Sequence, residues 1–438
     1  MIRDLMSSRR FAPLFWAQFC SALNDNVLKN ALVIILLYRA TTGHGDALVT
    51  IAGAVFIFPF FILSGLGGEL ADKYVKGVVA RRLKFAEIFA AGFAAAGFFL
   101  HSIPLLFVAL ALFGIVAALF GPVKYALLPD QLTVGELATG NALVEGATFL
   151  AILLGTIAGG LLVAGSSHMG WVTSVIMLLA LLSWGFCSRI PHTMPSAPDL
   201  VVTANPWTST IGLLKSLYAE PRLWNGMLIV SWFWLTGAVV LSLLPALIKD
   251  IVGGTEAVVT LCLAIFAIGI AGGSLFAAQL SHHGPNLALV PIGAIVMGMS
   301  GLDIAWAIGH ATSGSGITPA DFATSFSGVR MIADFAILAV GGGLFVVPSF
   351  AAVQAWSAPF ERARVIAAGN ILQAGFMAGG SLVVAALQAI GCSIAWIFFG
   401  LAIASFGWIF FVRGKWGKEG AGDFSARPGA AGGMRFTQ

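Results

Sequence analysis

The stretch FAPLFWAQFCSALNDNVLKNALVIILLY occupies residues 11–38 and decides the fold class. It is longer than the roughly 20 residues that a helix needs to cross a bilayer, yet Asp25, Lys29 and three asparagines lie in its middle. A charge at the bilayer centre costs roughly 2.5–3.5 kcal/mol on insertion scales, so such residues usually face a protein interior or a wet cavity. Asp25 and Lys29 are four residues apart on one helix face and can partly neutralise each other. The stretch therefore predicts a membrane helix with a polar site at membrane depth, which is typical of transporters.

The composition extends this interpretation to the whole chain. Of the 438 residues, 59% are hydrophobic and only 10% are charged, whereas a soluble domain carries about 25% charged residues. We therefore expect an all-α polytopic membrane protein. The cysteines at 20, 187, 262 and 392 lack the spacing of a disulfide framework or metal site, so we expect no metal and no cofactor. The net charge of +4 is not gathered into a basic patch with interleaved aromatic residues, which argues against a nucleic-acid partner.

Twelve apolar stretches are long enough to cross the bilayer, and they set the domain organisation. We expect a six-helix half in residues 1–189, a second six-helix half in 222–413, and between them a cytoplasmic linker, 190–221, with an amphipathic helix lying on the membrane. The Gly- and Ala-rich tail, 414–438, is expected to be disordered and cytoplasmic. The expected spans are 11–38, 48–71, 81–102, 104–127, 137–164, 170–189, 222–248, 256–280, 286–309, 329–353, 362–388 and 391–412.

The basic residues predict the orientation of these spans. Cytoplasmic loops of membrane proteins carry an excess of Lys and Arg. With both chain ends in the cytoplasm, only Arg39, Lys249 and Arg330 of the 23 basic residues lie at outer ends, while Lys29 and Lys124 lie within spans. All the others are then cytoplasmic, so we expect both termini on that side.

A short motif recurs in the two halves. The segment GNALVEG, 140–146, opens the fifth span, and GNILQAG, 369–375, opens the eleventh. Gly, Asn, Leu and Gly recur in register, and Pro122 of the fourth span corresponds to Pro348 of the tenth. Parallel repeats of six helices produce such a pattern. Together with the central linker, the repeat predicts the major facilitator architecture.

The loop after the second span carries a candidate gate. The segment GELADKYVK, 68–76, resembles the major facilitator signature at this place, although Val75 replaces the usual glycine. Asp72 can pair with basic groups and with the end of a neighbouring helix, and so hold a cytoplasmic gate shut. The alternative is a charged loop that only sets topology. The expected gating residues are Gly68, Asp72, Lys73 and Lys76.

Four segments carry a narrower resemblance. They are WAQFCSALNDN (16–26, followed by Lys29 and Asn30), GPVKYALLP (121–129), GNALVEG (140–146) and AILLGTIAGG (151–160). Together they resemble the bacterial lysophospholipid transporter family. The likeness is greatest to the transporter module of fused proteins in which it precedes an acyltransferase and an acyl–acyl-carrier-protein (acyl-ACP) ligase. The resemblance runs over most of the chain and is strongest in the first half.

This resemblance implies a flippase for lysophosphatidylethanolamine and related lysolipids. It would move them from the outer to the inner leaflet of the bacterial inner membrane for re-acylation, by rocker-switch alternating access. The implied partners are the lysophospholipid, membrane lipids and a cytoplasmic acyltransferase or acyl-ACP ligase, and the chain is expected to be a monomer. Leu241 stands where some family members carry an intramembrane arginine. Coupling to a proton stays open.

Polar residues within the spans form the expected headgroup site. Asp25 would meet an ammonium group, and Lys29 or the asparagine amides would meet phosphate; the alternative is a structural polar network. Lys124 either holds phosphate near the inner end of the fourth span or snorkels to the interface. The expected substrate-binding residues are Asp25, Asn26, Lys29, Asn30, Lys124, Asn141, Glu145, Asn370 and Gln373.

Two other classes of function would fit a polytopic membrane protein. A proton-coupled antiporter of drugs or metabolites on the same fold would also need carboxylates in the membrane. A membrane acyltransferase would need a catalytic pair such as H-x-x-x-x-D, and none of the seven histidines has an aspartate at that spacing. We therefore expect a transporter and not an enzyme.

Overall fold

The computed structural model describes residues 2–38, 45–164, 170–203, 205–281, 284–310, 315–412 and 414. This part of the chain is almost entirely helical, with one isolated β-bridge between Gly254 and Ile317. The expected disordered tail lies outside the described residues, except Gly414. The expectation of an all-α polytopic protein is confirmed.

Twelve long helices of the described part form two groups of six. The first half contains α2 (Ala12–Tyr38), α3 (Gly45–Lys73), α4 (Lys76–Phe99), α5 (Ile103–Gln131), α6 (Val134–Ala164) and α7 (Gly170–Cys187). The second half contains α9 (Pro221–Ala246), α10 (Glu256–Gln279), α11 (Leu289–Gly309), α13 (Phe326–Trp356), α14 (Arg362–Ala389) and α15 (Ile394–Phe411). Shorter elements are α1 (Ile2–Ser7), α8 (Pro206–Ala219), the π-helical turn η1 (Leu247–Val252) and α12 (Pro319–Thr324).

Eleven of these twelve described helices are apolar enough to cross a membrane, and α4 is the exception. It begins at Lys76, five residues before the expected start at Arg81. Two charges deeper in α4 neutralise each other: Lys84 Nζ lies 2.5 Å from Glu87 Oε2, and both side chains are buried. Lys84 also donates to Ser21 Oγ of α2 at 2.6 Å. A polar helix can thus lie inside the bundle because its charges are satisfied by neighbouring helices.

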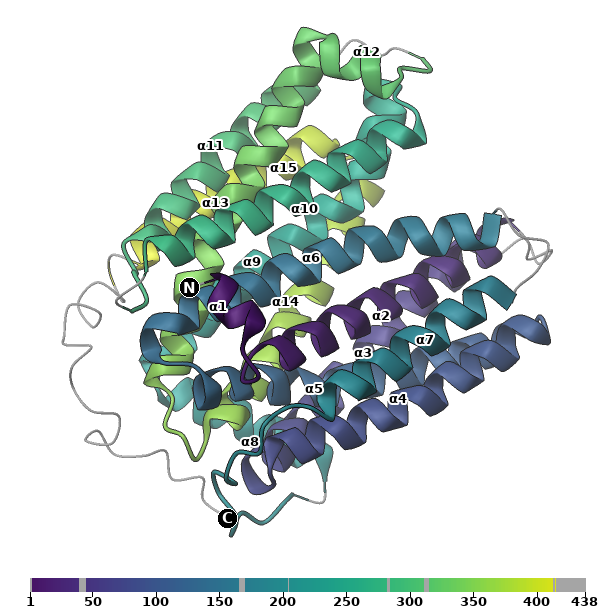
Figure 1. The fold of residues 1–438 in the computed structure, drawn as a ribbon. Coiled ribbons are helices and arrows are strands. Elements are labelled where there is room, and N and C mark those ends of the chain that lie inside the picture. The colour runs from purple at the N-terminus through teal and green to yellow at the C-terminus, as the bar shows by residue number, and fades with distance from the viewer. Residues whose placement is uncertain are drawn as a thin grey trace.

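The two halves meet near one end of the bundle and diverge toward the other (Figure 1). Across the halves, α3 packs against α14 and α6 packs against α10. We call the end where α8 lies the linker end. Inward-facing glycines allow close approach here: a Cβ on Gly68 of α3 would lie 2.8 Å from the carbonyl oxygen of Ala363 and 2.7 Å from Cβ of Ala367. The structure is therefore closed at the linker end.

The linker contains the expected amphipathic helix, α8. Asn205 caps its first turn by accepting a hydrogen bond from the backbone N–H of Trp207 at 3.0 Å. One face, with Leu213 and Leu217, is buried against the bundle, where α8 contacts α3, α14 and α9. The other face exposes Trp207, Ile211 and Tyr218. Those aromatic and aliphatic side chains suit a membrane surface, so the interfacial placement of α8 stays a prediction.

Candidate functional site

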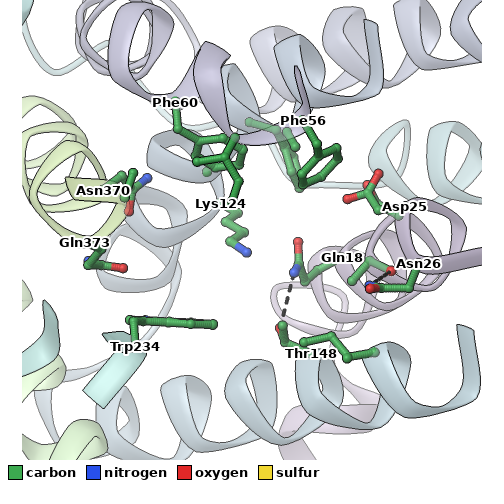
Figure 2. Close-up of a pocket in the computed structure, with 18 of the residues that line it drawn as sticks. Gln18, Asp25, Asn26, Phe56, Phe60, Lys124, Thr148, Trp234, Asn370 and Gln373 are labelled. Atoms are coloured by element: carbon green, nitrogen blue, oxygen red, sulfur yellow. Dashed lines mark hydrogen bonds between the residues drawn. The ribbon is translucent and has the colours of Figure 1, made fainter. Parts of the chain in front are cut away.

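A cavity of about 280 Å³ lies between the two halves. Its walls come from α2, α3, α5 and α6 of the first half and from α9 and α14 of the second. Lys124 extends toward the middle, Asp25 and Asn26 lie on one side, and Asn370, Gln373 and Trp234 lie on the other (Figure 2). The lining residues are Gln18, Ser21, Ala22, Asp25, Asn26, Lys29, Phe56, Ile57, Phe60, Ala117, Phe120, Gly121, Lys124, Tyr125, Thr148, Ile152, Trp234, Asn370, Gln373, Ala374 and Met377.

Three charged side chains line the cavity: Asp25, Lys29 and Lys124. The Asp25 carboxylate makes no hydrogen bond or ion pair with any residue that the structure describes. Lys29 lies four residues away but does not pair with it, and its ammonium lies instead 4.5 Å from the ring centroid of Phe56. The Lys124 ammonium lies 4.6 Å from the ring centroid of Tyr125. Charges inside a membrane protein are normally paired. These three make no ion pair with the described residues, so they remain available to a ligand.

Amide and hydroxyl groups complete the polar wall. Gln18 of α2 donates to Thr148 Oγ1 of α6 at 3.3 Å. Asn26 donates to the carbonyl oxygen of Ala22 in its own helix at 2.7 Å. Across the cavity, Gln373 of α14 has a buried Nε2 without a hydrogen-bond partner among the described residues. The second half thus presents a free donor toward the charges of the first.

The rest of the wall is apolar and aromatic. Phe56 and Phe60 come from α3, Met377 from α14 and Trp234 from α9. Trp234 stacks on Phe149 with ring centroids 5.8 Å apart. The lining therefore combines charged and amide groups with aromatic and aliphatic side chains, as a site for an amphiphile would.

The structure places six of the nine expected site residues in this wall; the other three, Asn30, Asn141 and Glu145, do not line it. Asn30 joins α2 to α6 by donating to Thr156 Oγ1 at 3.1 Å. Glu145 accepts from the Tyr125 hydroxyl at 2.8 Å, and Asn141 donates to Gln354 at 2.6 Å. Gln18, Thr148 and Trp234 were not expected to line the site. Of these, only Gln18 could have been found from the sequence, because it is a polar residue within an apolar span, six residues before the NDN motif.

Close packing of α6 on α2 positions Asp25 and Asn26. A Cβ on Gly155 would lie 2.6 Å from Asn26 Cβ and 2.9 Å from the carbonyl oxygen of Leu23, whereas one on Gly160 would meet nothing within 4 Å. Gly155→Ala should therefore push α2 aside and lower the free energy of unfolding by about 1–3 kcal/mol, as overpacking does. Gly160→Ala should be neutral to slightly stabilising, because nothing crowds the added methyl group and alanine favours helix. Thermal unfolding of both purified variants checks this; equal midpoints would contradict the packing argument.

Asp72 joins the two halves at the linker end. Its carboxylate accepts from the backbone N–H of Ala363 at 3.1 Å, from that of Arg364 at 3.2 Å, and from Arg364 Nε at 3.0 Å. The first N–H groups of α14 lack intrahelical acceptors, so a carboxylate is well placed there. Asp72 therefore holds α3 to the start of α14.

A second ionic contact lies beside it. Lys76 Nζ lies 2.8 Å from Asp130 Oδ2, and Asp130 Oδ1 lies 3.4 Å from Nη1 of Arg362. Lys76 thus reaches the second half through Asp130. Of the four expected gating residues, Gly68, Asp72 and Lys76 lie at this contact. The Lys73 ammonium instead lies 5.7 Å from the ring centroid of Tyr74.

We expect the contact at the linker end to depend on pH through Glu361. Burial raises the pKa of its carboxyl from 4.5 to about 7; Arg364 opposes the rise, while Asp72 and Glu220 add to it. The neutral acid is therefore favoured while the linker end is closed, and opening of this end would expose the group to water and restore its ordinary pKa. Closure takes up a proton, so the closed gate should be most stable below about pH 4.5 and lose stability as the pH rises to about 7.

Spin labels can measure this effect. Val134 of α6 and Ala288, just before α11, are exposed and belong to different halves, so cysteines at both form a gate reporter pair. Cys392, the partly exposed natural cysteine, is replaced by serine. We expect the long-distance population to grow between about pH 4.5 and 7, and Glu361→Gln to flatten that dependence. An unchanged pH profile in Glu361→Gln would assign the effect to another group.

Comparison with known proteins supplies the family. The chain matches the model of the Major Facilitator Superfamily over residues 14–318. It is 27% identical over 379 residues to the lysophospholipid transporter LplT of Serratia proteamaculans (strain 568), covering 83% of each chain. It is 28% identical over 384 residues to the LplT of Salmonella heidelberg (strain SL476), again covering 83% of each. The resemblance seen in the sequence motifs is therefore confirmed.

Solved structures share the fold. The human organic anion transporter MFSD10 (TETRAN) superposes with a TM-score of 0.73 at 17% identity, covering 92% of this chain and 98% of that one. A bacterial homologue of the iron transporter ferroportin, in its outward-facing state, gives a TM-score of 0.66 at 15% identity, covering 94% and 99%. At such low identity these likenesses show the fold alone. With the family match extending over more than half of its length, the chain belongs to the major facilitator superfamily.

Proposed function

We propose that this protein is a lysophospholipid transporter that moves lysophosphatidylethanolamine and related lysolipids from the outer to the inner leaflet. The observation that carries the proposal is the cavity, in which unpaired charges lie together with aromatic and aliphatic side chains at membrane depth. A lysolipid likewise combines a charged headgroup with one apolar chain. The likeness to the LplT transporters supports the same substrate class.

The charges suit a zwitterionic headgroup. Lys124, assisted by Lys29, would hold the phosphate, and Asp25 would hold the ammonium of ethanolamine. Asn26, Asn370 and the free Nε2 of Gln373 would donate to phosphate or glycerol oxygens. Donors from both halves on one headgroup would let a ligand stabilise the closure of the halves around it.

The acyl chain would leave the cavity between α3 and α14. Both helices contribute apolar lining residues: Phe56, Ile57 and Phe60 from α3, and Ala374 and Met377 from α14. The other contact between the halves, of α6 with α10, is a poorer exit for the chain, because none of the described residues of α10 lines the cavity. A chain lying between α3 and α14 would stay in contact with lipid while the headgroup crosses.

Direction follows from the positive-inside distribution and the closed gate. We infer that the linker end and both termini are cytoplasmic, in the inner membrane of a bacterium, so the closed linker end corresponds to an outward-facing state. Lysolipid would enter from the outer leaflet, and a rocker-switch motion would then open the gate toward the inner leaflet. Re-acylation by a cytoplasmic acyltransferase or acyl-ACP ligase would remove the product. No catalytic step by this chain, acting as a monomer, is needed.

One observation favours a proton-coupled antiporter as the second candidate. Glu145 is buried, and its Oε2 has no hydrogen-bond partner among the described residues, so it could carry a proton through the cycle together with Asp25. Such a protein would bind small organic cations at Asp25 and would not require a phosphate.

Binding to the purified protein separates the two candidates. We expect lysophosphatidylethanolamine to raise the unfolding temperature in a saturable manner, while tetraphenylphosphonium and ethidium have no effect. Dodecyl maltoside at matched micelle concentration controls for general amphiphile effects. Stabilisation by the cations and not by the lysolipid would replace the proposal with the antiporter.

A further inference from the structure

A buried pair of amides joins the halves between the cavity and the gate. Asn141 Nδ2 of α6 donates to Gln354 Oε1 of α13 at 2.6 Å, and Gln354 Nε2 donates back to Asn141 Oδ1 at 3.2 Å. Both side chains are 0% exposed. Each amide thus gives one donor and one acceptor to the other, in a place where an unpaired amide would be costly. The contact exists only while these parts of α6 and α13 are together.

The same glutamine reaches the wall of the cavity. Gln354 Nε2 also donates to the backbone carbonyl oxygen of Tyr125 at 3.2 Å. The Tyr125 side chain lines the cavity, and its ring packs edge-on against Phe350 of α13 with centroids 4.6 Å apart. Its hydroxyl donates to Glu145 Oε1 at 2.8 Å. Tyr125 is therefore fixed on one side by α6 and on the other by α13.

Toward the linker end the contacts continue into the gate. Arg362 Nε donates to the carbonyl oxygen of Gln354 at 3.1 Å, and Arg362 is the arginine that pairs with Asp130. A continuous set of contacts thus runs from the cavity to the charged gate.

We propose that the Asn141–Gln354 pair is a latch of the closed linker end, and that Tyr125 couples it to the ligand in the cavity. The coupling rests on the proposed function; the latch does not. The Lys124 ammonium lies over the Tyr125 ring. A phosphate that draws this ammonium away removes the cation–π contact that helps to hold Tyr125. Movement of Tyr125 takes away an acceptor of Gln354, and the pair opens.

A neutral pair suits a latch that must open in every cycle. Breaking a buried ion pair leaves uncompensated charge and is strongly unfavourable, whereas separated amides need only be met by water. In this proposal the Asp72 and Asp130 contacts supply most of the stability of the closed gate. The amide pair is the contact that opens in response to the ligand. Asn141 and Gln354 act through the gate and are positioning residues.

The gate reporter pair tests the latch without any substrate. Asn141→Ala should raise the ratio of open to closed gate about tenfold, the effect of about 1.4 kcal/mol. Gln354→Leu, which keeps the volume, should do the same, and the double variant should add little because both remove one contact. The control is Asn24→Ala, an equally buried asparagine that donates to the carbonyl oxygen of Ile176 within one half at 3.1 Å. It should leave the ratio unchanged.

Unshifted distance distributions in both Asn141→Ala and Gln354→Leu would overturn the latch. If Asn141→Ala does not fold, Gln354→Leu alone decides. A shift of equal size in Asn24→Ala would also overturn it, because the effect would then be general destabilisation.

Tyr125→Leu tests the coupling. It removes the ring that contacts Lys124 and Phe350 but keeps the backbone carbonyl that accepts from Gln354. In the parent, lysophosphatidylethanolamine should shift the reporter distances toward the open gate, and in Tyr125→Leu this shift should fall at least about threefold. An equal shift in both would remove Tyr125 from the coupling and leave the latch. No lysolipid response in the parent, with Asn141→Ala still open, would overturn the proposed function and with it the coupling.

Discussion

Lys124→Ala is expected to lower the initial rate of lysophosphatidylethanolamine uptake about 100-fold. Lys124 extends into the middle of the cavity, and Lys29 is the only other cation that lines it among the described residues. A hydrogen bond to a charged group contributes about 1.5–3 kcal/mol, and a buried phosphate would keep only Lys29 as a cationic partner. Uptake of radiolabelled lysolipid, normalised to protein in the membrane, measures the effect.

Two controls accompany that substitution. Lys124→Arg keeps the charge and should retain a measurable fraction of the rate. Lys215→Ala removes an exposed lysine of α8 and should transport like the parent. Normal uptake by a correctly inserted Lys124→Ala would show that Lys124 does not hold the phosphate.

Asp72→Ala is expected to raise the ratio of open to closed linker-end gate by more than about 100-fold. Three hydrogen bonds across the halves end on this carboxylate, and removing one partner of a buried ion pair typically costs about 3–5 kcal/mol. The gate reporter pair measures the ratio, and Asp72→Asn should lie between the parent and Asp72→Ala.

The matched control is Asp199→Ala, which removes an exposed aspartate of the linker and should leave the gate closed. A closed gate in Asp72→Ala would show that the motif in the second loop serves topology alone. Transport should fall in Asp72→Ala as well, because an outward-facing state that is rarely populated cannot load substrate from the outer leaflet.

Much of the fold could be predicted because the length and apolar composition of membrane helices are visible in the sequence. The spans agree with the structure to within a few residues at most ends. The start of α4 is predicted five residues too late, at Arg81, because Lys76 looks like part of the preceding charged loop when read alone. Only the packed structure shows how Lys84 and Glu87 neutralise each other inside the bundle.

The site could be predicted where a charged residue lies inside an apolar span. Asp25, Lys29 and Lys124 are charges inside apolar spans, and all three line the cavity. Trp234 gave no such signal, since aromatic residues are common in membrane helices. The partners of Asp72 and Asp130 could not be predicted either, because Arg364 and Arg362 look like charges at the start of a span that only set its orientation. The Asn141–Gln354 contact joins residues 213 positions apart, which no local pattern reveals.

The most direct test of the central claim is uptake of labelled lysophosphatidylethanolamine into cells that lack their own transporter, comparing this protein with Asp25→Asn. The account predicts uptake by the parent and its collapse in a correctly inserted Asp25→Asn, because the neutral amide cannot pair with the ammonium. Uptake by both would keep the substrate and remove Asp25 from the mechanism. No uptake by either would contradict the proposed function and leave the antiporter as the better account.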